Sequence, residues 1–298
     1  MVAGAAVAGV LLAALATLVW SGSFVAARAL GATVPPVQAA FWRWAVALAV
    51  VAPFGARAAW RQRALLRRHP GWLLLASLLG VTVYNTLVHQ AGTTTPAGTM
   101  GLVMAASPVL MALYERLGGA RLGARRTTGT LVACGGVALL LGARPGAEPP
   151  GPADLWIVAA AVCFGSYSAL LRRRPAGLGG PALLFTTFAL GTLLLLPVYA
   201  VDVTLRGGFP ATPGTVGPLL YLGVFSSAVA FFAWNRAVQL IGAARAGVVY
   251  YLQPLGVALL AYLLLDEVPG PVGLAAMALV LGGVALGAAP GAPRRRAR

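Results

Sequence analysis

Polar side chains are rare in the long apolar runs of this sequence, so the few present are the first candidates for chemistry. Met104 and Ser107 share one stripe at helical spacing, and Tyr250 and Gln253 occupy the equivalent stripe 146 residues later. Hydroxyl and amide groups there offer neutral hydrogen bonds to a polar solute, and methionine offers apolar contact. The stripes predict a binding surface, and simple packing between helices is the alternative that the spacing leaves open.

A second set of polar and aromatic residues lies in other apolar runs. Tyr84 and His89 make one run unusually polar, and Trp234 marks the equivalent end of another. Histidine titrates near neutral pH, so His89 is a candidate proton carrier, unless it lies at the outer interface and bonds to water. For serine, bonding back to the helix's own backbone is the alternative to lining a site. The remaining candidates for a lining role are Trp20, Ser23, Phe24 and Tyr167.

Three residues are expected to act on structure or gating rather than on a solute. Arg43 lies seven residues into an apolar run, about 10 Å deep by the helical rise. An isolated arginine at mid-bilayer costs about 2.5–3.5 kcal/mol, so its side chain must point inward, snorkel or bind carbonyls. Pro108 and Pro254 each free a backbone carbonyl one turn earlier in the helix, which loosens it there, or act as simple kinks.

The elements that carry these residues are apolar runs long enough to cross a bilayer. The chain is 59% hydrophobic and 9% charged, far below the quarter of charged residues usual in soluble domains. Runs of about 20 apolar residues are typical of membrane-spanning helices. The small residues of Gly129/Ala133/Gly136 and Gly283/Gly287 predict close approach between such helices. The sequence predicts an all-α integral membrane protein with ten spans, at residues 7–29, 37–53, 70–90, 98–117, 125–142, 153–171, 181–201, 215–237, 243–265 and 271–288.

The two halves of the chain repeat one another. Residues 22–24 return as 165–167 at an offset of 143, residues 91–108 as 237–254 at 146, and residues 135–139 as 282–286 at 147. A Pro/Gly segment at residues 144–152 separates the halves, which predicts repeats at 1–147 and 148–298. Because each repeat holds five spans, an odd number, the second is expected to be inverted relative to the first. Many secondary transporters build a substrate site at the bilayer midplane from such repeats.

The basic residues fix the expected orientation. The formal net charge is +16, and most of the 22 basic residues fall in loops on the side of the N-terminus, whereas most of the six acidic residues fall on the other. The positive-inside rule therefore predicts that both termini are cytoplasmic and that the protein lies in the cell inner membrane. This distribution argues against binding to nucleic acid, because no folded domain gathers the charge.

Several short motifs, weak singly, recur in a specific order. They are Trp20-Ser21-Gly22-Ser23-Phe24, Phe41-Trp42-Arg43-Trp44, Pro108, Pro254, and Asp266-Glu267 followed by Gly270-Pro271-Val272-Gly273. With these motifs the chain resembles the ten-helix exporters of the drug/metabolite transporter superfamily, and among them most nearly the aromatic amino-acid exporters. The resemblance implies two inverted five-helix halves and a structural role for Arg43. One departure is Arg121, which stands where the first half would carry the equivalent of Glu267.

These observations together predict an exporter of small metabolites, most nearly aromatic or other large neutral amino acids, that works by alternating access through a central cavity. Export of drugs or of nucleotide-sugars and phosphorylated metabolites is one alternative, although the latter would require more arginines than Arg43. A non-transporting receptor or assembly protein is the other. The sequence contains no P-loop, nucleophile elbow or metal motif, so no enzyme activity, cofactor or metal is expected. The expected partners are a small-molecule substrate and the lipid bilayer, and the oligomeric state stays open, with a monomer compatible.

Overall fold

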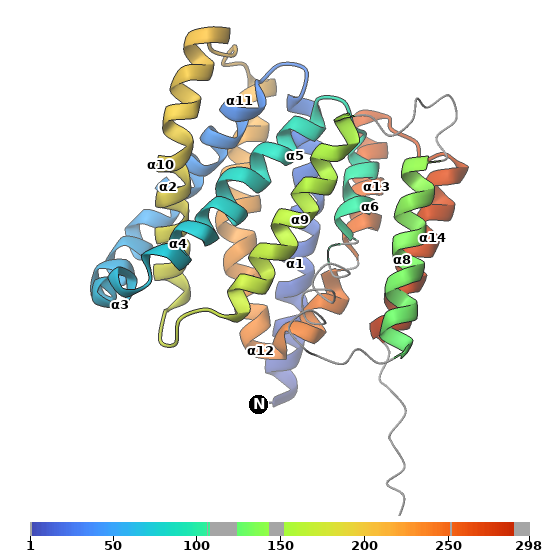
Figure 1. Cartoon of the computed structure of the whole chain (residues 1–298), viewed down its shortest axis with the longest axis horizontal. Coiled ribbons are helices and arrows are strands. Elements are labelled where there is room, and N and C mark those ends of the chain that lie inside the picture. Colours follow the sequence, from blue (N-terminus) through green and yellow to red (C-terminus); the bar gives the residue numbers. More distant parts are fainter. Residues whose placement is uncertain (1, 106, 108–123, 143–151, 251, 289–298) are drawn as a thin grey trace, which may run out of the picture.

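The computed structural model describes residues 2–105, 107, 124–142, 152–250 and 252–288, and these residues form helices joined by short turns. No strand occurs among them, which confirms the predicted all-helical class. The helices, labelled as in Figure 1, are α1 (Val2–Leu30), α2 (Pro36–Arg61), α3 (Arg63–Arg68), α4 (Pro70–Ser77), α5 (Tyr84–Gly92), α6 (Ala97–Ala105), α8 (Ala124–Gly142), α9 (Pro152–Arg172), α10 (Gly180–Arg206), α11 (Pro213–Leu220), α12 (Ala230–Tyr250), α13 (Gln253–Leu265) and α14 (Pro271–Ala288). Two π-helical segments, η1 (Leu78–Val83) and η2 (Tyr221–Val229), complete the description.

Helical runs of membrane-spanning length lie where the sequence predicts them. Five are long and apolar enough to cross a bilayer: Gly4–Leu30, Pro36–Arg61, Pro70–Gly92, Gly180–Arg206 and Pro213–Ala237. Shorter apolar helices cover Thr127–Leu139, Leu155–Leu171, Gln253–Leu265 and Pro271–Gly283. Helices suit a bilayer because all their backbone hydrogen bonds are made within one segment. The predicted span at 98–117 is described only through α6 and residue 107, and Pro108 and Arg121 lie outside the described residues.

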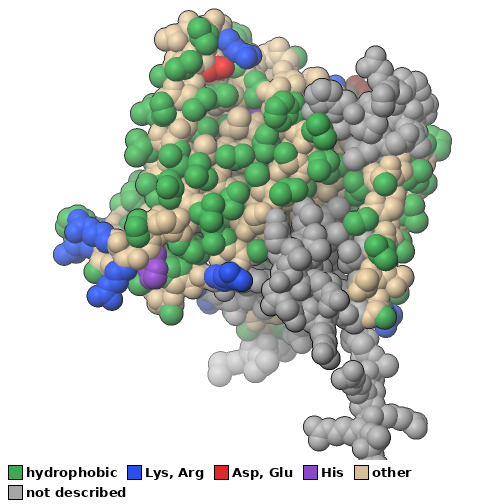
Figure 2. Space-filling view, in the orientation of Figure 1, with side chains coloured by type: hydrophobic (Ala, Val, Ile, Leu, Met, Phe, Trp, Pro, Cys, Tyr) green, Lys and Arg blue, Asp and Glu red, His purple; other side chains and the backbone are tan. Residues whose placement is uncertain are grey.

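The surface of the bundle is divided by residue type. Large apolar side chains such as Leu131, Leu193 and Leu259 are mostly exposed, as expected of side chains that meet lipid. Figure 2 shows hydrophobic side chains over most of the visible face, with basic side chains at the end that carries α3. The exposed arginines there are Arg57, Arg61, Arg63, Arg67 and Arg68. We call this the inner end, and the opposite end, which holds Leu30, Gly92 and Arg206, the outer end.

One predicted boundary is wrong. The loop expected at residues 238–242 is helical, because α12 continues from Ala230 to Tyr250. The break comes instead just before α13, whose first turn contains Pro254. A proline has no N–H to donate to the carbonyl four residues earlier, which is that of Tyr250. The helix therefore ends at Tyr250, whereas the sequence predicted only a loosened or kinked helix.

Small residues bring the last helices of the two halves into contact. Helices α8 and α14 lie side by side over their length (Figure 1). A Cβ atom on Gly283 would lie 2.5 Å from both Gly129 O and Ala133 N, so only glycine fits there. A Cβ on Gly136 would likewise lie 2.9 Å from Ala276 O. The predicted small-residue faces are confirmed as the surfaces through which α8 and α14 pack.

The third run of each half contains a π-helical segment. Segment η1 has 6 residues and lies between α4 and α5, and η2 has 9 residues and lies between α11 and α12. Gly80 of η1 and Gly223 of η2 stand 143 residues apart in equivalent positions. A Cβ on Gly80 would lie 2.6 Å from the Tyr167 ring, and one on Gly223 would lie 2.5 Å from Val46. Each widened turn thus admits a side chain from a neighbouring helix, and π segments frequently occur at functional sites.

Candidate functional site

Five aromatic residues from both halves form one continuous cluster, which we call the aromatic group. The ring of Trp20 on α1 lies 5.3 Å from Trp234 and 6.1 Å from Tyr250, and these two rings lie 5.8 Å apart. Phe164 on α9 joins them to the third run, since its ring is 6.4 Å from Tyr250 and 5.5 Å from Tyr84. The structure therefore brings together four of the residues that the sequence predicts to line a site.

The indole of Trp20 is held in place by the π segment of the eighth run. Its Nε1 donates a hydrogen bond of 2.9 Å to Ser226 O in η2. Phe231, just beyond that segment, meets the same indole edge-on at 5.5 Å. Edge-to-face pairs of this kind are preferred over stacked sandwiches because of the ring quadrupole. The orientation of Trp20 is thus set by η2 and α12, which belong to the other half.

Arg43 is buried between α2 and η2. Its side chain is 4% exposed, Nε donates to Ser227 Oγ at 2.9 Å, and Nη2 donates to Ser226 Oγ at 3.2 Å. The guanidinium also lies 5.5 Å from the centre of the Trp44 ring. Of the three arrangements considered for this arginine, the structure shows the inward-pointing one.

The polar face of α5 is buried. His89 is 2% exposed, and neither Nδ1 nor Nε2 has a hydrogen-bond partner. The alternative that His89 lies at the outer interface and bonds to water is therefore wrong. The physical reason is that α1 covers this face of α5, because Phe24 and Ala27 pack in the same apolar cluster as Val88.

The predicted hydroxyl groups bond to their own helices. Ser23 Oγ donates to Trp20 O at 2.6 Å, and Ser107 Oγ donates to Met104 O at 2.6 Å. The structure thus shows the back-bonded alternative for both serines, although each oxygen keeps lone pairs that can accept. Tyr167, 7% exposed, is the residue whose ring fills the space beside Gly80 of η1.

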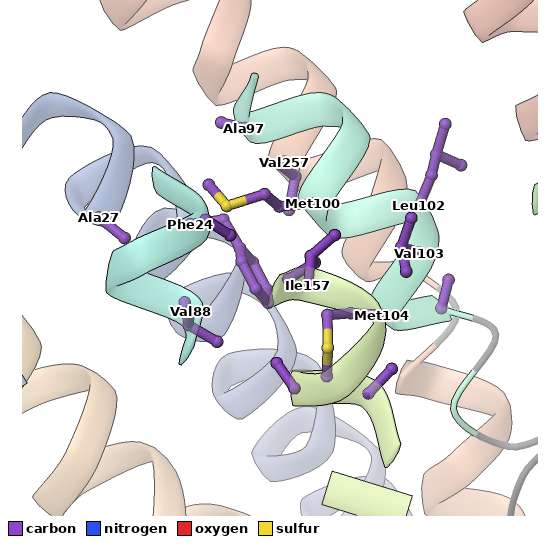
Figure 3. Packing of buried hydrophobic residues seen from close by; sticks show 14 of the residues in the cluster. Phe24, Ala27, Val88, Ala97, Met100, Leu102, Val103, Met104, Ile157 and Val257 are labelled. Carbon is purple, nitrogen blue, oxygen red and sulfur yellow. The ribbon is translucent and has the colours of Figure 1, made fainter. Parts of the chain in front are cut away.

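Phe24 and Met104 belong to the main apolar core rather than to the aromatic group. Both are buried, at 1% and 0% exposure, in a cluster that also holds Ile157 of α9. Figure 3 shows Phe24, Ile157 and Met104 lying near one another, with Met100 and Val257 above them. The core therefore joins α1, α6, α9 and α13, with Tyr84 packed against its edge.

Gln253 stands at the start of α13, where its side chain and backbone have separate roles. The backbone oxygen accepts a hydrogen bond of 3.1 Å from Ser21 Oγ. The side chain is 2% exposed, and its Oε1 has no hydrogen-bond partner. Because buried polar atoms are almost always paired, this oxygen is a candidate for binding a donor.

A salt bridge joins the two halves at the outer end. Arg28 Nε lies 3.1 Å from Glu267 Oε1, and Arg28 Nη1 donates to Gly92 O at 3.3 Å and to Thr93 O at 3.2 Å. Glu267 Oε2 accepts a bond of 2.9 Å from the Ala97 N–H at the start of α6. We call this set of contacts the outer tie. It links the end of α1 to α5, to α6 and to the turn that follows α13.

Sequence analysis missed several residues that organise the site. Ser226 and Ser227 form a polar pair in the middle of an apolar run, and that pair was the available signal for a partner to Arg43. Phe164 directly precedes the repeated residues 165–167, yet it has no aromatic counterpart 143 residues earlier, where Ser21 stands. Arg28 was not singled out, because its contact with Glu267 joins positions 239 residues apart.

Two pockets open at the outer end, and neither is the predicted central cavity. One, of about 310 Å³, lies among Gly31, Pro35, Gln90, Thr93 and Arg206. The other, of about 260 Å³, lies beside the outer tie and is lined by Pro96, Leu102, Ala258 and Glu267 among others. Within the described part of the chain, no three His, Cys, Asp or Glu residues gather as a metal site would require.

Comparison with known proteins gives consistent matches over most of the chain. A family model described as the EamA-like transporter family matches residues 7–142 and 151–288. The chain is 32% identical over 245 residues to a protein of Streptantibioticus cattleyicolor named "probable terminal-alkyne amino-acid exporter", covering 81% of this chain and 79% of that protein. It is 27% identical over 268 residues to a protein of Archaeoglobus fulgidus named "uncharacterized transporter", covering 87% and 90%.

The fold also matches a solved structure. A chain in a crystal structure superposes with a TM-score of 0.65 at 26% sequence identity. The match covers 93% of this chain and 95% of that one, so the two folds agree along nearly their whole length.

Proposed function

The chain belongs to the EamA-like transporter family, and on that premise we propose that it exports amino acids, with aromatic and other large neutral ones favoured. The aromatic group carries this proposal, because its rings come from α1, α5, α9 and α12 and can pack against a large apolar side chain. The relative named as an amino-acid exporter, 32% identical, supports the same substrate class.

The transporter is proposed to consist of two inverted repeats, at residues 1–147 and 148–298. Support comes from the family model, which matches once in each half. Helices in equivalent positions also pair across the halves, α2 with α10 and α8 with α14. With the basic inner end facing the cytoplasm, the positive-inside rule gives an inner-membrane protein with both termini inside.

Transport is proposed to follow alternating access, in which the two ends of the bundle open in turn. The outer tie supports this mechanism, because it holds elements of both halves together at the outer end. At the equivalent inner position, 146 residues earlier than Glu267, the sequence has Arg121 and so lacks the acid. The outer ion pair therefore has no equivalent acid in the first half of the sequence, and opening of the outer end requires that pair to break.

The proposed substrate site lies among the residues predicted from the sequence, between the two ends. The aromatic group supplies apolar contact, and Gln253, Tyr84 and His89 supply hydrogen-bonding atoms. A site built from neutral groups binds weakly, and a millimolar dissociation constant corresponds to only about −4 kcal/mol. Such affinity suffices for an exporter that loads from a concentrated cytosol.

Uptake of radiolabelled amino acids into proteoliposomes, with and without a pH gradient, tests the proposed function. We expect saturable flux of phenylalanine, tryptophan and leucine, competed by one another and absent from empty liposomes. Absence of flux for every amino acid tested, in vesicles that contain folded protein, would rule out the substrate class.

Replacing Gln253 by alanine is expected to reduce flux roughly tenfold, because a lost hydrogen bond to a ligand costs about 1 kcal/mol or more. The change removes the side-chain amide, whose oxygen has no partner, but leaves the backbone oxygen that Ser21 contacts, so folding should be unaffected. Gln90→Ala, which removes a half-buried glutamine outside the aromatic group, is the matched control. Wild-type flux in Gln253→Ala would exclude this side chain from the site.

A further inference from the structure

Arg43 is a buried cation, and the described residues place no carboxylate against it. Its two hydrogen bonds go to the neutral hydroxyls of Ser226 and Ser227 and use two of the five N–H donors of a guanidinium. Two ion pairs between described residues, Arg28–Glu267 and Arg206–Asp202, both lie at the outer end and do not involve Arg43. Buried charges are normally paired, so Arg43 requires an explanation that the fold alone does not provide.

Asn85 lies on α5, which packs against α2, the helix that carries Arg43. Its Nδ2 donates to Gly80 O at 3.2 Å and to Val81 O at 3.3 Å, which fixes the orientation of the amide. Its Oδ1 is consequently the free end of the group, and this atom is buried with no hydrogen-bond partner. His89 stands one turn further along the same face of α5.

Arg43 and the aromatic group both donate a hydrogen bond to the same residue, Ser226. Ser226 accepts a hydrogen bond from Arg43 through its hydroxyl and one from Trp20 through its carbonyl oxygen. The Trp44 ring, which adjoins Arg43, also lies 6.2 Å from Phe231, and Phe231 contacts Trp20. A positive charge and a group of rings therefore lie side by side. The acceptor of Asn85 belongs to the residue that directly follows Tyr84 of the aromatic group, and Val81, whose carbonyl fixes its amide, shares an apolar cluster with Trp44.

We propose that Arg43 binds the α-carboxylate of the substrate and that Asn85 Oδ1 accepts a hydrogen bond from its α-ammonium. This inference rests on the proposed function and specifies how a zwitterion is recognised. The planar guanidinium matches a carboxylate through two parallel hydrogen bonds, and a low dielectric strengthens that attraction. The substrate side chain then lies against the aromatic group. Arg43 lies on α2, which packs against α5 of the same half and against η2 of the other half, so the rearrangement proposed for transport uncovers it.

Binding of three ligands that share one ring tests the assignment: phenylalanine, phenylalaninamide, which lacks the negative charge, and 3-phenylpropionate, which lacks the ammonium. Affinity is measured on the purified full-length protein by competition against radiolabelled phenylalanine or by thermal stabilisation. We expect the wild type to prefer phenylalanine to its amide by about tenfold, equivalent to about 1.4 kcal/mol. Arg43→Gln should reduce that preference to about twofold or less, and Arg43→Lys, which keeps the charge without the planar fork, should fall between.

Asn85→Ala should lose discrimination at the ammonium group of the ligand, whereas the Arg43 variants lose it at the carboxylate. It should lose the preference for phenylalanine over 3-phenylpropionate and keep the preference for phenylalanine over its amide. A purely structural role for either residue would weaken all three ligands alike. The matched controls are Arg57→Gln, an exposed arginine on the same helix as Arg43, and Thr86→Ala, whose hydroxyl bonds to its own helix.

The outcomes separate this inference from the proposed function. Equal affinity of the wild type for phenylalanine and its amide, with amino-acid flux intact, overturns the Arg43 assignment and leaves the function standing. An unchanged preference in Arg43→Lys and Arg43→Gln does the same, and the lysine variant decides if the glutamine variant does not fold. Binding of 3-phenylpropionate alone, lost in the Arg43 variants, supports the carboxylate site and rejects the amino-acid substrate. No binding of any of the three rejects both.

Discussion

Gly283→Leu should lower the thermal unfolding midpoint of the purified protein by roughly 5–10 °C, whereas Gly282→Leu should leave it nearly unchanged. A Cβ on Gly283 would lie 2.5 Å from backbone atoms of Gly129 and Ala133, which cannot rotate away as a side chain could. Overpacking of this kind typically costs about 1–3 kcal/mol, and rigid backbone on the facing helix puts this site at the upper end of that range. Helices α8 and α14 must then separate.

Gly282 is the matched control because it differs from Gly283 by a single position. It is exposed, and a Cβ there would meet nothing within 4 Å. Leucine also has a better helix propensity than glycine, so this variant should be neutral or slightly more stable. The measurement is a thermal melt of both variants in the same detergent, followed by size-exclusion chromatography. Equal midpoints for the two variants would show that the close packing of α8 and α14 contributes little to stability.

Glu267→Gln should open the outer end of the bundle. The change removes the ion pair with Arg28 and weakens the acceptor of the Ala97 N–H. Both side chains are partly exposed, at 33% for Arg28 and 22% for Glu267, so the tie should be worth only about 1–2 kcal/mol. That free energy corresponds to a roughly 5–30-fold shift between closed and open forms.

A cysteine beneath the tie reports the opening. Met100, 0% exposed on α6, is replaced by cysteine in a chain whose Cys134 and Cys163 are changed to alanine, and labelling by a membrane-impermeant maleimide is timed in cells. We expect about tenfold faster labelling in Glu267→Gln and an unchanged rate in Asp266→Asn. Asp266 is the right control because it has a φ of 54°, a left-handed conformation that asparagine tolerates. Equal acceleration in both variants would mean that general loss of negative charge, rather than the tie, controls opening.

Sequence reasoning succeeded where the residue types alone indicate the contact that they make. Glycine at 283 opposite glycine at 129 can only serve a close approach, and the structure shows that approach. Trp20 and Trp234 were chosen from their positions in the repeat, and they lie in contact. The helices themselves followed from hydropathy, because apolar length is sufficient to specify a helix in a bilayer.

Sequence reasoning failed where the burial or the partner of a side chain depends on which other helix packs against its own. Helical spacing places His89 and Asn85 on one face, but only the packing of α1 against α5 shows that this face is buried. An inward-pointing Arg43 was one of three arrangements that the sequence left open, and its serine partners lie 183 and 184 residues away. The extension of α12 to Tyr250 was missed because the proline that ends this helix, Pro254, is not part of it. Pro254 lies four residues further along the chain, in the first turn of α13.

The paired π segments explain the larger of the two changes in offset between the halves. Equivalent residues differ by 143 positions at Gly22 and Gly80, by 146 over residues 91–108 and by 147 over residues 135–139. The difference of three equals the excess length of η2, with 9 residues, over η1, with 6. Three residues added to a regular α-helix would turn everything after them by about 300°, and the binding face would no longer match its counterpart. The wider turns of η2 accommodate the added residues, so a change in chain length that usually requires a loop is absorbed inside a membrane helix.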